Sequence, residues 1–173
     1  GSPQIRNQGT IGGNLCTSSP IGDIAPVFLA LNAKLNIFGS NGRKKVNLNE
    51  FYTGYRKNIL TKDEIVSSIE VPLPKKDYNL FCWKLSKRYD QDISTISLTV
   101  YIKIRDQIID DIHLAAGGIA ENPKYLDNLC KDMIGQKLDK SISLAINNIK
   151  NYIKPISDIR GTADYRIESF RGL

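Results

Sequence analysis

Short runs of alternating apolar and polar residues dominate the first half of the chain and predict strands. Such alternation occurs at Lys34–Phe38 and at Lys45–Leu48, and it places one face of each segment against a core. Ile65–Val71 is a further strand candidate, which Pro72 and Pro74 end. Ser40-Asn41-Gly42 stands between the first two runs, where an Asn-Gly pair favours a tight hairpin turn. We therefore expect a hairpin followed by a third strand.

The segments that flank these strands have different patterns. Residues 4–20 are rich in Gly, Ser, Thr and Asn without a sustained period, which predicts a loop. Asp23 precedes the apolar run 24–31, so we expect a short buried helix there with aspartate as its N-cap. Residues 72–77 are polar and contain two prolines, which is typical of a linker between two units.

Beyond this linker the pattern again predicts strands. Residues 81–87 predict a strand, and residues 97–104 and 108–116 are rich in β-branched residues and alternate between apolar and polar positions. Asp106-Gln107 would join those two runs as a hairpin. The only histidine, His113, falls within the last run, so we interpret it as a strand histidine without a chemical role.

After Gly117-Gly118 the period changes from two to between three and four residues, which is the period of a helix. The apolar positions that show it are Leu126, Leu129, Met133, Ile142, Ala145, Ile146, Ile149 and Ile153. Pro155 ends this region, and residues 163–173 predict a last helix. Strands followed by helices indicate an α+β fold.

Composition excludes several classes of protein. The 173 residues are 41% hydrophobic and carry 24 Lys+Arg against 18 Asp+Glu, a net charge of +6, which is typical of a folded chain. No apolar run reaches the roughly 18 residues that a membrane span needs. The charge is spread evenly, and the one basic triplet, Arg43-Lys44-Lys45, is interpreted as a solvated hairpin tip. We therefore expect neither a nucleic-acid nor a membrane partner.

The cysteines do not indicate a metal centre. Cys16, Cys82 and Cys130 are widely spaced and form no Cys-x-x-Cys pair, so we expect neither zinc nor an iron–sulfur cluster on this chain. We interpret them as reduced thiols, mostly small core residues, in a cytoplasmic protein.

The segment Gly9–Asn14 is the first candidate for chemistry. Its sequence is Gly-Thr-Ile-Gly-Gly-Asn, and Ser18–Asp23 follows closely. Glycines let backbone amides approach an anion, and Thr10 and Asn14 add polar side chains. The spacing matches neither a P-loop nor a dinucleotide fingerprint. A structural turn and a phosphate or nucleotide loop therefore both remain open.

The second candidate is the aromatic and charged run that extends from Phe81 to Ile93. Strand alternation would put Trp83 and Lys84 on opposite faces. An aromatic ring beside cations can pack on a flat ligand while a cation stabilises its negative charge. The alternative is a strand that ends in a charged turn, with Arg88 and Asp90 paired at the surface.

The chain resembles the molybdenum hydroxylases, the xanthine dehydrogenase family, in motifs that follow one another along its whole length. These motifs are Gln4–Asn7, Gly9–Asn14, Ser19–Asp23, Phe51–Lys57, Ser68–Pro72, Lys84–Ser94, Gly117–Ala120 and Ser157–Arg166. The Lys84–Ser94 run is more similar to the small subunit of bacterial xanthine dehydrogenases than to carbon monoxide or nicotinate dehydrogenases.

The resemblance implies an architecture. Residues 1–75 would be the C-terminal subdomain of a PCMH-type FAD-binding domain. Residues 78–173 would be a CO dehydrogenase flavoprotein C-terminal-like domain, an antiparallel sheet with helices. In the family, an earlier FAD subdomain and two 2Fe-2S domains lie upstream. Because those parts and an initiating Met are absent, the chain is expected to be a C-terminal fragment of a longer polypeptide.

The same resemblance implies FAD contacts at particular positions. A loop that holds the phosphate and ribityl groups of FAD matches Thr10, Ile11, Gly12, Gly13 and Asn14. Asp23 matches an acidic FAD contact, and Val66 matches an apolar one. Trp83 matches an aromatic residue close to the flavin, and Lys84 matches a lysine that contacts FAD. Arg88 and Asp90 match the loop that approaches the flavin from the nicotinamide side.

The implied function is electron transfer. In the whole enzyme, a molybdopterin site on a large subunit would hydroxylate a purine, and electrons would pass through 2Fe-2S clusters to FAD and then to NAD. This chain would supply half of the FAD site and no catalytic acid or base. Two alternatives remain open. The chain could be a structural and interaction fragment that does not retain FAD alone. It could also belong to a molybdenum hydroxylase that acts on an aldehyde, nicotinate or CO.

Overall fold

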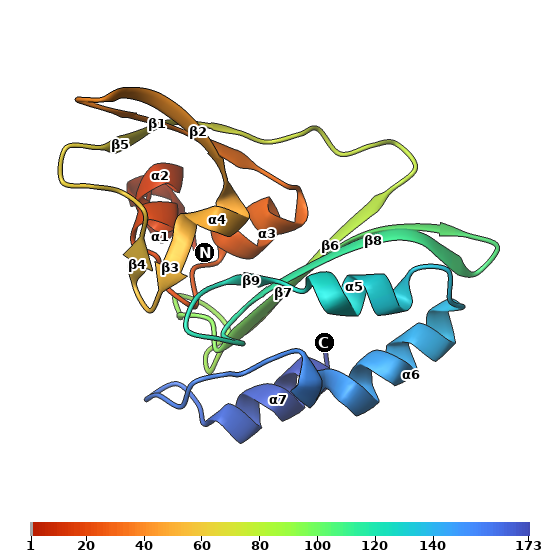
Figure 1. Ribbon diagram of the computed structural model, residues 1–173. Helices are drawn as coiled ribbons and strands as arrows, with labels where there is room; N and C mark the ends of the chain where they lie inside the picture. The colour runs from red at the N-terminus through yellow and green to blue at the C-terminus, as the bar shows by residue number, and fades with distance from the viewer. Residues whose placement is uncertain (1) are drawn as a thin grey trace.

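The first half of the chain forms a three-stranded antiparallel sheet over several short helices. The computed structural model describes residues 2–173 and orders this sheet β2-β1-β5 (Figure 1). The strands are β1 (Lys34–Gly39), β2 (Gly42–Asn47) and β5 (Ile65–Glu70). All three predicted strands are therefore confirmed. The turn at Ser40-Asn41 is followed by Gly42 at φ 101°, a conformation that glycine adopts without strain.

The basic triplet lies exposed on β2, as predicted. Lys44 Nζ lies 2.6 Å from Glu64 Oε1, and Lys45 Nζ lies 2.7 Å from Glu70 Oε2. The Arg43 guanidinium lies 5.9 Å from the centre of the Phe38 ring. These cations therefore contact groups in the hairpin, in β5 and at the residue just before β5.

The prediction of a loop over residues 4–20 is wrong, because two short helices form there. They are α1 (Pro3–Gln8) and α2 (Ile11–Cys16). Thr10 Oγ1 accepts a hydrogen bond from the Gly13 N–H at 3.0 Å and so begins α2. Only Leu15 is buried in either helix. Neither helix therefore carries the apolar stripe that a periodicity argument requires.

Four further elements complete the first half. The predicted helix is confirmed as α3 (Ile24–Ala30), and α4 (Leu48–Phe51) follows the hairpin. A two-stranded sheet, β3 (Tyr52–Gly54) with β4 (Lys57–Asn58), was not predicted from the sequence. Residues 71–78 contain no helix or strand, and residues 71–77 are exposed.

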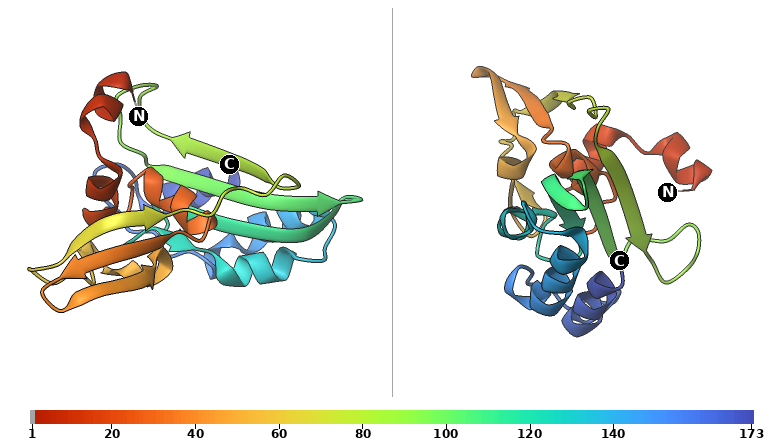
Figure 2. Two further views of the ribbon diagram at one scale, coloured as in Figure 1. Left: turned by 90° about the horizontal axis from the view of Figure 1, so that it is seen from above. Right: turned by 90° about the vertical axis from the view of Figure 1, so that its right-hand side faces the viewer.

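The second half contains a four-stranded antiparallel sheet ordered β6-β7-β8-β9. Its strands are β6 (Asn79–Leu85), β7 (Ile96–Arg105), β8 (Ile108–Gly117) and β9 (Lys124–Tyr125). The predicted hairpin is confirmed, and Asp106 and Gln107 adopt φ of 49° and 64°. Positive φ at both positions is typical of the two-residue turns whose twist matches a hairpin. Figure 2 shows β6 at the outer edge of this sheet.

Helices cover one face of the four-stranded sheet (Figure 1). They are α5 (Asp127–Met133), α6 (Leu138–Asn148), the 3-10 helix η1 (Ile149–Asn151) and α7 (Ala163–Arg171). The predicted helical region and last helix are thus confirmed, as is the α+β class. Among residues 2–173, no helix combines the length and apolar character that crossing a membrane would require.

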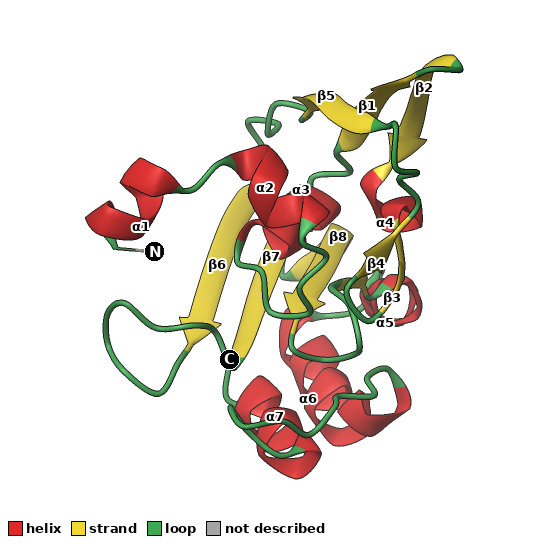
Figure 3. Ribbon diagram, turned by 90° about the vertical axis from the view of Figure 1, so that its left-hand side faces the viewer, coloured by secondary structure: helices red, strands yellow, loops and turns green. Residues whose placement is uncertain are grey.

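The other face of that sheet packs against the first half of the chain, where α3 contacts β7 and β8 (Figure 3). Successive side chains of β8 point to opposite faces of the sheet and so belong to two different cores. Ala116 belongs to the cluster under α5, α6 and α7, whereas Ala115 belongs to the cluster around α3 and α4. Tyr101 on β7 joins Ala115 in the second cluster. The two halves therefore share one of the two cores.

The histidine lies on β8, as predicted, within a group of aromatic side chains. His113 Nδ1 lies 2.9 Å from the Tyr125 hydroxyl, and its Nε2 lies 3.3 Å from Asp111 Oδ2. Tyr78 donates to the same Asp111 oxygen at 2.6 Å and stacks on Tyr101 at 4.6 Å. The hydrogen bond to Asp111 raises the pKa of Tyr78 to about 12. These contacts attach the end of the exposed 71–78 segment to the sheet.

The three cysteines are free thiols in different surroundings. Cys130 is 3% exposed, and burial raises its pKa from 9.0 to about 11. Cys82 lies exposed on β6, so the expectation of mostly core thiols is wrong at that position. Burial and the raised pKa together make the Cys130 thiol unreactive at neutral pH, because the thiolate is the nucleophile.

Brief treatment of the folded protein with iodoacetamide should therefore alkylate Cys82 and leave Cys130 unmodified, as mass spectrometry would show. Equal labelling would contradict the burial of Cys130.

Candidate functional site

A polar cavity of about 660 Å³ lies where the first half of the chain meets the loop that follows β6. The first half contributes Asp23, and residues from α1 and α2, including Ile5 and Asn14, extend the wall. The second half contributes Lys84 and much of the segment 86–94. The cavity therefore exists only because the two halves pack together.

The central contact of this cavity is an ion pair between the halves. Lys84 Nζ lies 2.7 Å from Asp23 Oδ2 and also donates to the Asp92 carbonyl oxygen at 2.8 Å. The other Asp23 oxygen accepts a hydrogen bond from the Ser94 hydroxyl. A lysine ammonium has three N–H donors, so two are used here and a third is available to a ligand.

This arrangement corrects the prediction that Asp23 caps α3. Asp23 occupies the N-cap position, but its side chain makes no capping hydrogen bond. Its backbone is in the right-handed helical region, at φ −73° and ψ −26°, rather than the extended conformation usual for an N-cap. The carboxylate instead points to Lys84 and Ser94, which is a stronger, charge-assisted arrangement.

The loop after β6 is held by its own polar groups. The Arg88 N–H donates to Asp92 Oδ2 at 2.9 Å, and Arg88 Nε lies 3.7 Å from the same oxygen. The backbone N–H groups of Arg88 and Ile93 lower the pKa of the Asp92 carboxyl. Asp90 accepts from the Gln91 N–H instead of pairing with Arg88. The alternative of an Arg88–Asp90 surface pair is therefore wrong, and Asp92 is the partner.

Trp83 and Lys84 lie on opposite faces of β6, as alternation predicts. Trp83 stacks on Phe81, with ring centres 5.6 Å apart. Both rings line an apolar groove of about 380 Å³, together with Ile142 and other residues of β7, α6 and α7. The polar cavity is lined by Lys84 and not by Trp83. A contact between Trp83 and FAD therefore stays a prediction.

The glycine segment forms the first turns of α2 rather than an open loop. One amide, the Gly13 N–H, is already bonded to Thr10. A Cβ added at Gly12 would meet no atom within 4 Å, so the Gly12 backbone is open to a ligand. Asn14 lines the polar cavity, and its buried Oδ1 has no hydrogen-bond partner among residues 2–173. An unpartnered amide oxygen and a lysine donor from residues that line the same cavity fit a ligand with several hydroxyl and amide groups.

The remaining predicted site residues lie outside the lining of the polar cavity. Thr10 is the N-cap of α2, and Ile11, Gly12 and Gly13 precede Asn14 on that helix. Arg88 lies in the loop after β6, and Val66 lies half-buried on β5, which α2 contacts. Asp90 does line the cavity, as Asn14, Asp23 and Lys84 do.

Several polar residues that line the cavity were missed from the sequence, four of them charged or bonded to the ion pair. Ser94 and Asp92 hold the ion pair, while Arg56 and Arg160 line the wall. Ser94 and Asp23 are 71 positions apart, so no local pattern could have joined them. Arg56 and Arg160 fall within motifs already noted for the family resemblance, and that was their only signal.

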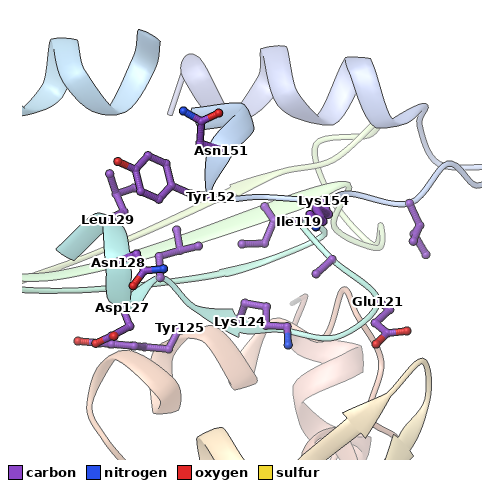
Figure 4. A pocket seen from close by; sticks show the side chains of 13 residues that line it. Ile119, Glu121, Lys124, Tyr125, Asp127, Asn128, Leu129, Asn151, Tyr152 and Lys154 are labelled. Atoms are coloured by element: carbon purple, nitrogen blue, oxygen red, sulfur yellow. The ribbon is translucent and has the colours of Figure 1, made fainter. Parts of the chain in front are cut away.

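A second cavity, of about 620 Å³, lies between β9 and the residues around η1 (Figure 4). Figure 4 shows Asn151 and Tyr152 on one side and Lys124 and Tyr125 on the other. None of the residues predicted to bind a cofactor lines it. The polar cavity is therefore the candidate site.

Comparison with protein families divides the chain in two. Residues 1–74 match the FAD binding domain in molybdopterin dehydrogenase. Residues 81–173, more than half of the chain, match the CO dehydrogenase flavoprotein C-terminal domain.

Curated and solved relatives agree with these matches. The glyceraldehyde dehydrogenase medium chain of Sulfolobus acidocaldarius is 34% identical over 169 residues, which are 97% of this chain and 59% of that protein. Xanthine dehydrogenase/oxidase of Gallus gallus is 32% identical over 143 residues, 81% of this chain and 10% of that protein. A chain of reconstituted CO dehydrogenase from Oligotropha carboxidovorans superposes with a TM-score of 0.91 at 26% identity, covering 99% of this chain and 61% of that one.

The chain thus spans about three fifths of the Sulfolobus acidocaldarius and Oligotropha carboxidovorans proteins and a tenth of the Gallus gallus one. Over that span it has the mixed helix and sheet fold of these proteins, with an antiparallel sheet covered by helices. The chain belongs to the FAD-binding flavoproteins of the molybdenum hydroxylase family.

Proposed function

We propose that this chain is the FAD-binding electron-transfer portion of a xanthine dehydrogenase. In that enzyme, 2Fe-2S clusters and a molybdopterin-binding large subunit would be its partners, and NAD would be the electron acceptor. The observation that carries the proposal is the Lys84–Asp23 pair, which brings a cation to a polar cavity between the halves. The family match over residues 1–74 supports FAD as the ligand.

FAD would supply the redox chemistry by accepting electrons and releasing hydride. The residues that would hold it are those at or beside the polar cavity: Thr10, Ile11, Gly12, Gly13, Asn14, Asp23, Val66, Lys84, Arg88 and Asp90, with Trp83 proposed from the family resemblance. Asp23 and the Asp92 carbonyl fix the Lys84 ammonium, so its third N–H would meet negative charge on a ligand. A fixed cation stabilises an anionic ligand more than a mobile one does.

The proposal is tested by Lys84→Ala in the complete enzyme. Loss of the ammonium should slow NAD reduction about tenfold, because one charge-assisted hydrogen bond to the developing anion is removed. Electron transfer from purine to the iron–sulfur clusters, followed by stopped-flow absorbance, should be unchanged. Lys87→Ala is the matched control, since Lys87 donates to the Ile159 carbonyl and does not line the cavity. Equal loss of both steps would contradict the role given to Lys84.

A second candidate is the same electron-transfer role in an enzyme for another substrate. The relative from Sulfolobus acidocaldarius acts on glyceraldehyde by its name, and a relative from Emericella nidulans, 34% identical over 171 residues, is a nicotinate hydroxylase. In this family the substrate would bind elsewhere, so residues 2–173 do not decide between them. Turnover assays of the complete enzyme with a purine, an aldehyde and nicotinate separate the two candidates.

We also expect the 173-residue chain alone to retain little FAD. Only three of the residues that line the polar cavity, Ser2, Ile21 and Ser94, are buried, and the chain spans only 59% of the medium-chain relative. Ligand sites usually bury most of their ligand, and an open wall gives fewer contacts. The measurement is flavin absorbance after gel filtration, followed by titration of FAD by fluorescence. Tight stoichiometric binding would contradict this expectation, together with the alternative of a purely structural fragment.

A further inference from the structure

A buried arginine from the last helix bonds the residue that follows Ser94, a lining residue of the polar cavity. Arg166 on α7 is 1% exposed and is among the largest fully buried side chains. Its Nη1 donates to the carbonyl oxygens of Thr95 at 2.6 Å and Gly118 at 3.3 Å. Its Nη2 lies 2.7 Å from Asp158 Oδ1. One guanidinium therefore connects three segments that are distant in sequence.

The first of these carbonyls closes the cavity loop. Thr95 follows Ser94, and the Thr95 N–H donates to the Leu85 carbonyl at 2.8 Å, at the end of β6. Leu85 follows Lys84, so this bond joins the two ends of the segment 86–94. Arg166 donates to the carbonyl oxygen of the same residue, Thr95. The positions of Ser94 and Lys84 thus depend on the hydrogen bonds that Thr95 makes with Leu85 and with Arg166.

The second residue bonded by Arg166, Gly118, is connected to the turn before Asp23. The Gly118 N–H donates to the Pro20 carbonyl at 2.7 Å, which attaches the end of β8 to the turn before Asp23. Gly118 has φ +80°, and a Cβ there would lie 2.3 Å from the Thr95 oxygen. The Gly118 peptide is therefore packed between Arg166 and the Pro20 segment. Hydrogen bonds therefore connect the Arg166 guanidinium to the segments that carry Asp23 and Lys84.

The positive charge of Arg166 is balanced by the Asp158 carboxylate rather than by a ligand. Burial raises the pKa of the Asp158 carboxyl, but the Arg160 N–H and the Arg166 guanidinium outweigh it and hold that pKa below its usual value. Asp158 is therefore ionised opposite Arg166. A planar guanidinium has several fixed donors, whereas a lysine could not bond two carbonyls and a carboxylate in this geometry.

We infer that Arg166 is a positioning residue of the candidate site, one that fixes the relative positions of Asp23, Ser94 and Lys84 through the Thr95 and Gly118 carbonyls. The inference rests on the proposed function only for the identity of the ligand. The position of Lys84 can be measured without any ligand.

The test uses Arg166→Gln, Arg166→Lys and Asp158→Asn in the complete flavoprotein. Brief acetylation of the FAD-free protein, followed by mass spectrometry, gives the ratio of Lys84 to Lys131 modification. Lys131 is a distant reference, exposed on α5 and paired with Asp127. The ratio should rise about fivefold in Arg166→Gln, because hydrogen bonds that hold Lys84 are weakened. Arg166→Lys keeps the positive charge but lacks the planar set of N–H donors of a guanidinium, so it should not restore the wild-type ratio.

The affinity for FAD, measured by fluorescence titration of the same proteins, should fall about tenfold. Arg171→Gln is the matched control, because Arg171 is on the same helix and bonds Glu168 and the Ile146 carbonyl instead. It should change neither readout.

The ratio of Lys84 to Lys131 acetylation decides whether Arg166 positions Lys84. A rise in the Lys84 ratio without a rise at other lysines supports positioning, since a general loss of stability would raise them all. An unchanged ratio in folded Arg166 variants overturns it. If the Arg166 variants do not fold, Asp158→Asn decides in the same way. If the wild-type protein does not bind FAD but the ratio changes, the proposed function fails and the positioning role stands.

Discussion

Replacing Gly118 with alanine should lower the free energy of unfolding by about 3 kcal/mol or more. Gly118 has φ +80°, and the new Cβ would lie 2.3 Å from the Thr95 carbonyl oxygen and 2.7 Å from Arg166 Nη1. The first neighbour is backbone and the second belongs to a buried side chain, so neither can move cheaply. Urea unfolding followed by circular dichroism measures the loss.

Gly135→Ala is the matched control for this substitution. Gly135 has a similar φ of +77°, but a Cβ there would meet no atom within 4 Å. Its cost should be limited to the left-handed backbone, about 1 kcal/mol. If both substitutions cost the same, the close packing at Gly118 described above is wrong.

Ala115→Asp should destabilise the chain by about 4 kcal/mol. Ala115 is fully buried on β8, in the core that the first half shares with the four-stranded sheet. A carboxylate there would lose its water without gaining a cation, because the cluster that surrounds it is apolar. Thermal and urea unfolding give the change, and hydrogen exchange should show faster opening of α3.

The control for Ala115→Asp is Leu73→Asp, at a position that is 90% exposed. That change should stay within about 0.5 kcal/mol of the original chain. If Ala115→Asp left the exchange of α3 amides unaltered, the two halves would not share this core.

The strands β1, β7 and β8 and the helices after Leu126 could be predicted because each packs one face against a core. Alternation at Lys34–Phe38 and the three-to-four spacing after Leu126 both follow from a side facing a core. By contrast, α1 and α2 together bury one residue, Leu15, so their pattern has no period to detect. The short strands β3, β4 and β9 contain two or three residues each, which is fewer than one period of evidence.

The candidate site could be predicted only in part, for a similar reason. Asp23 and Lys84 were named from a family resemblance, but their mutual contact spans 61 positions and has no local signature. An aspartate before an apolar run predicts an N-cap, and here a lysine from the other half competes successfully for the carboxylate. The same limit applies to Arg166, whose three partners lie up to 71 positions away.

The polar cavity, with one wall from each half, also has a thermodynamic consequence. A ligand that bridges the halves binds only the folded chain, so it adds RT ln(1 + [L]/Kd) to the free energy of unfolding, about 2.7 kcal/mol at a hundred times Kd. That amount is comparable to the loss from many core substitutions. Saturation of the cavity would therefore let the chain accept mutations that unfold it when free, so the ligand widens the range of sequences that evolution can use.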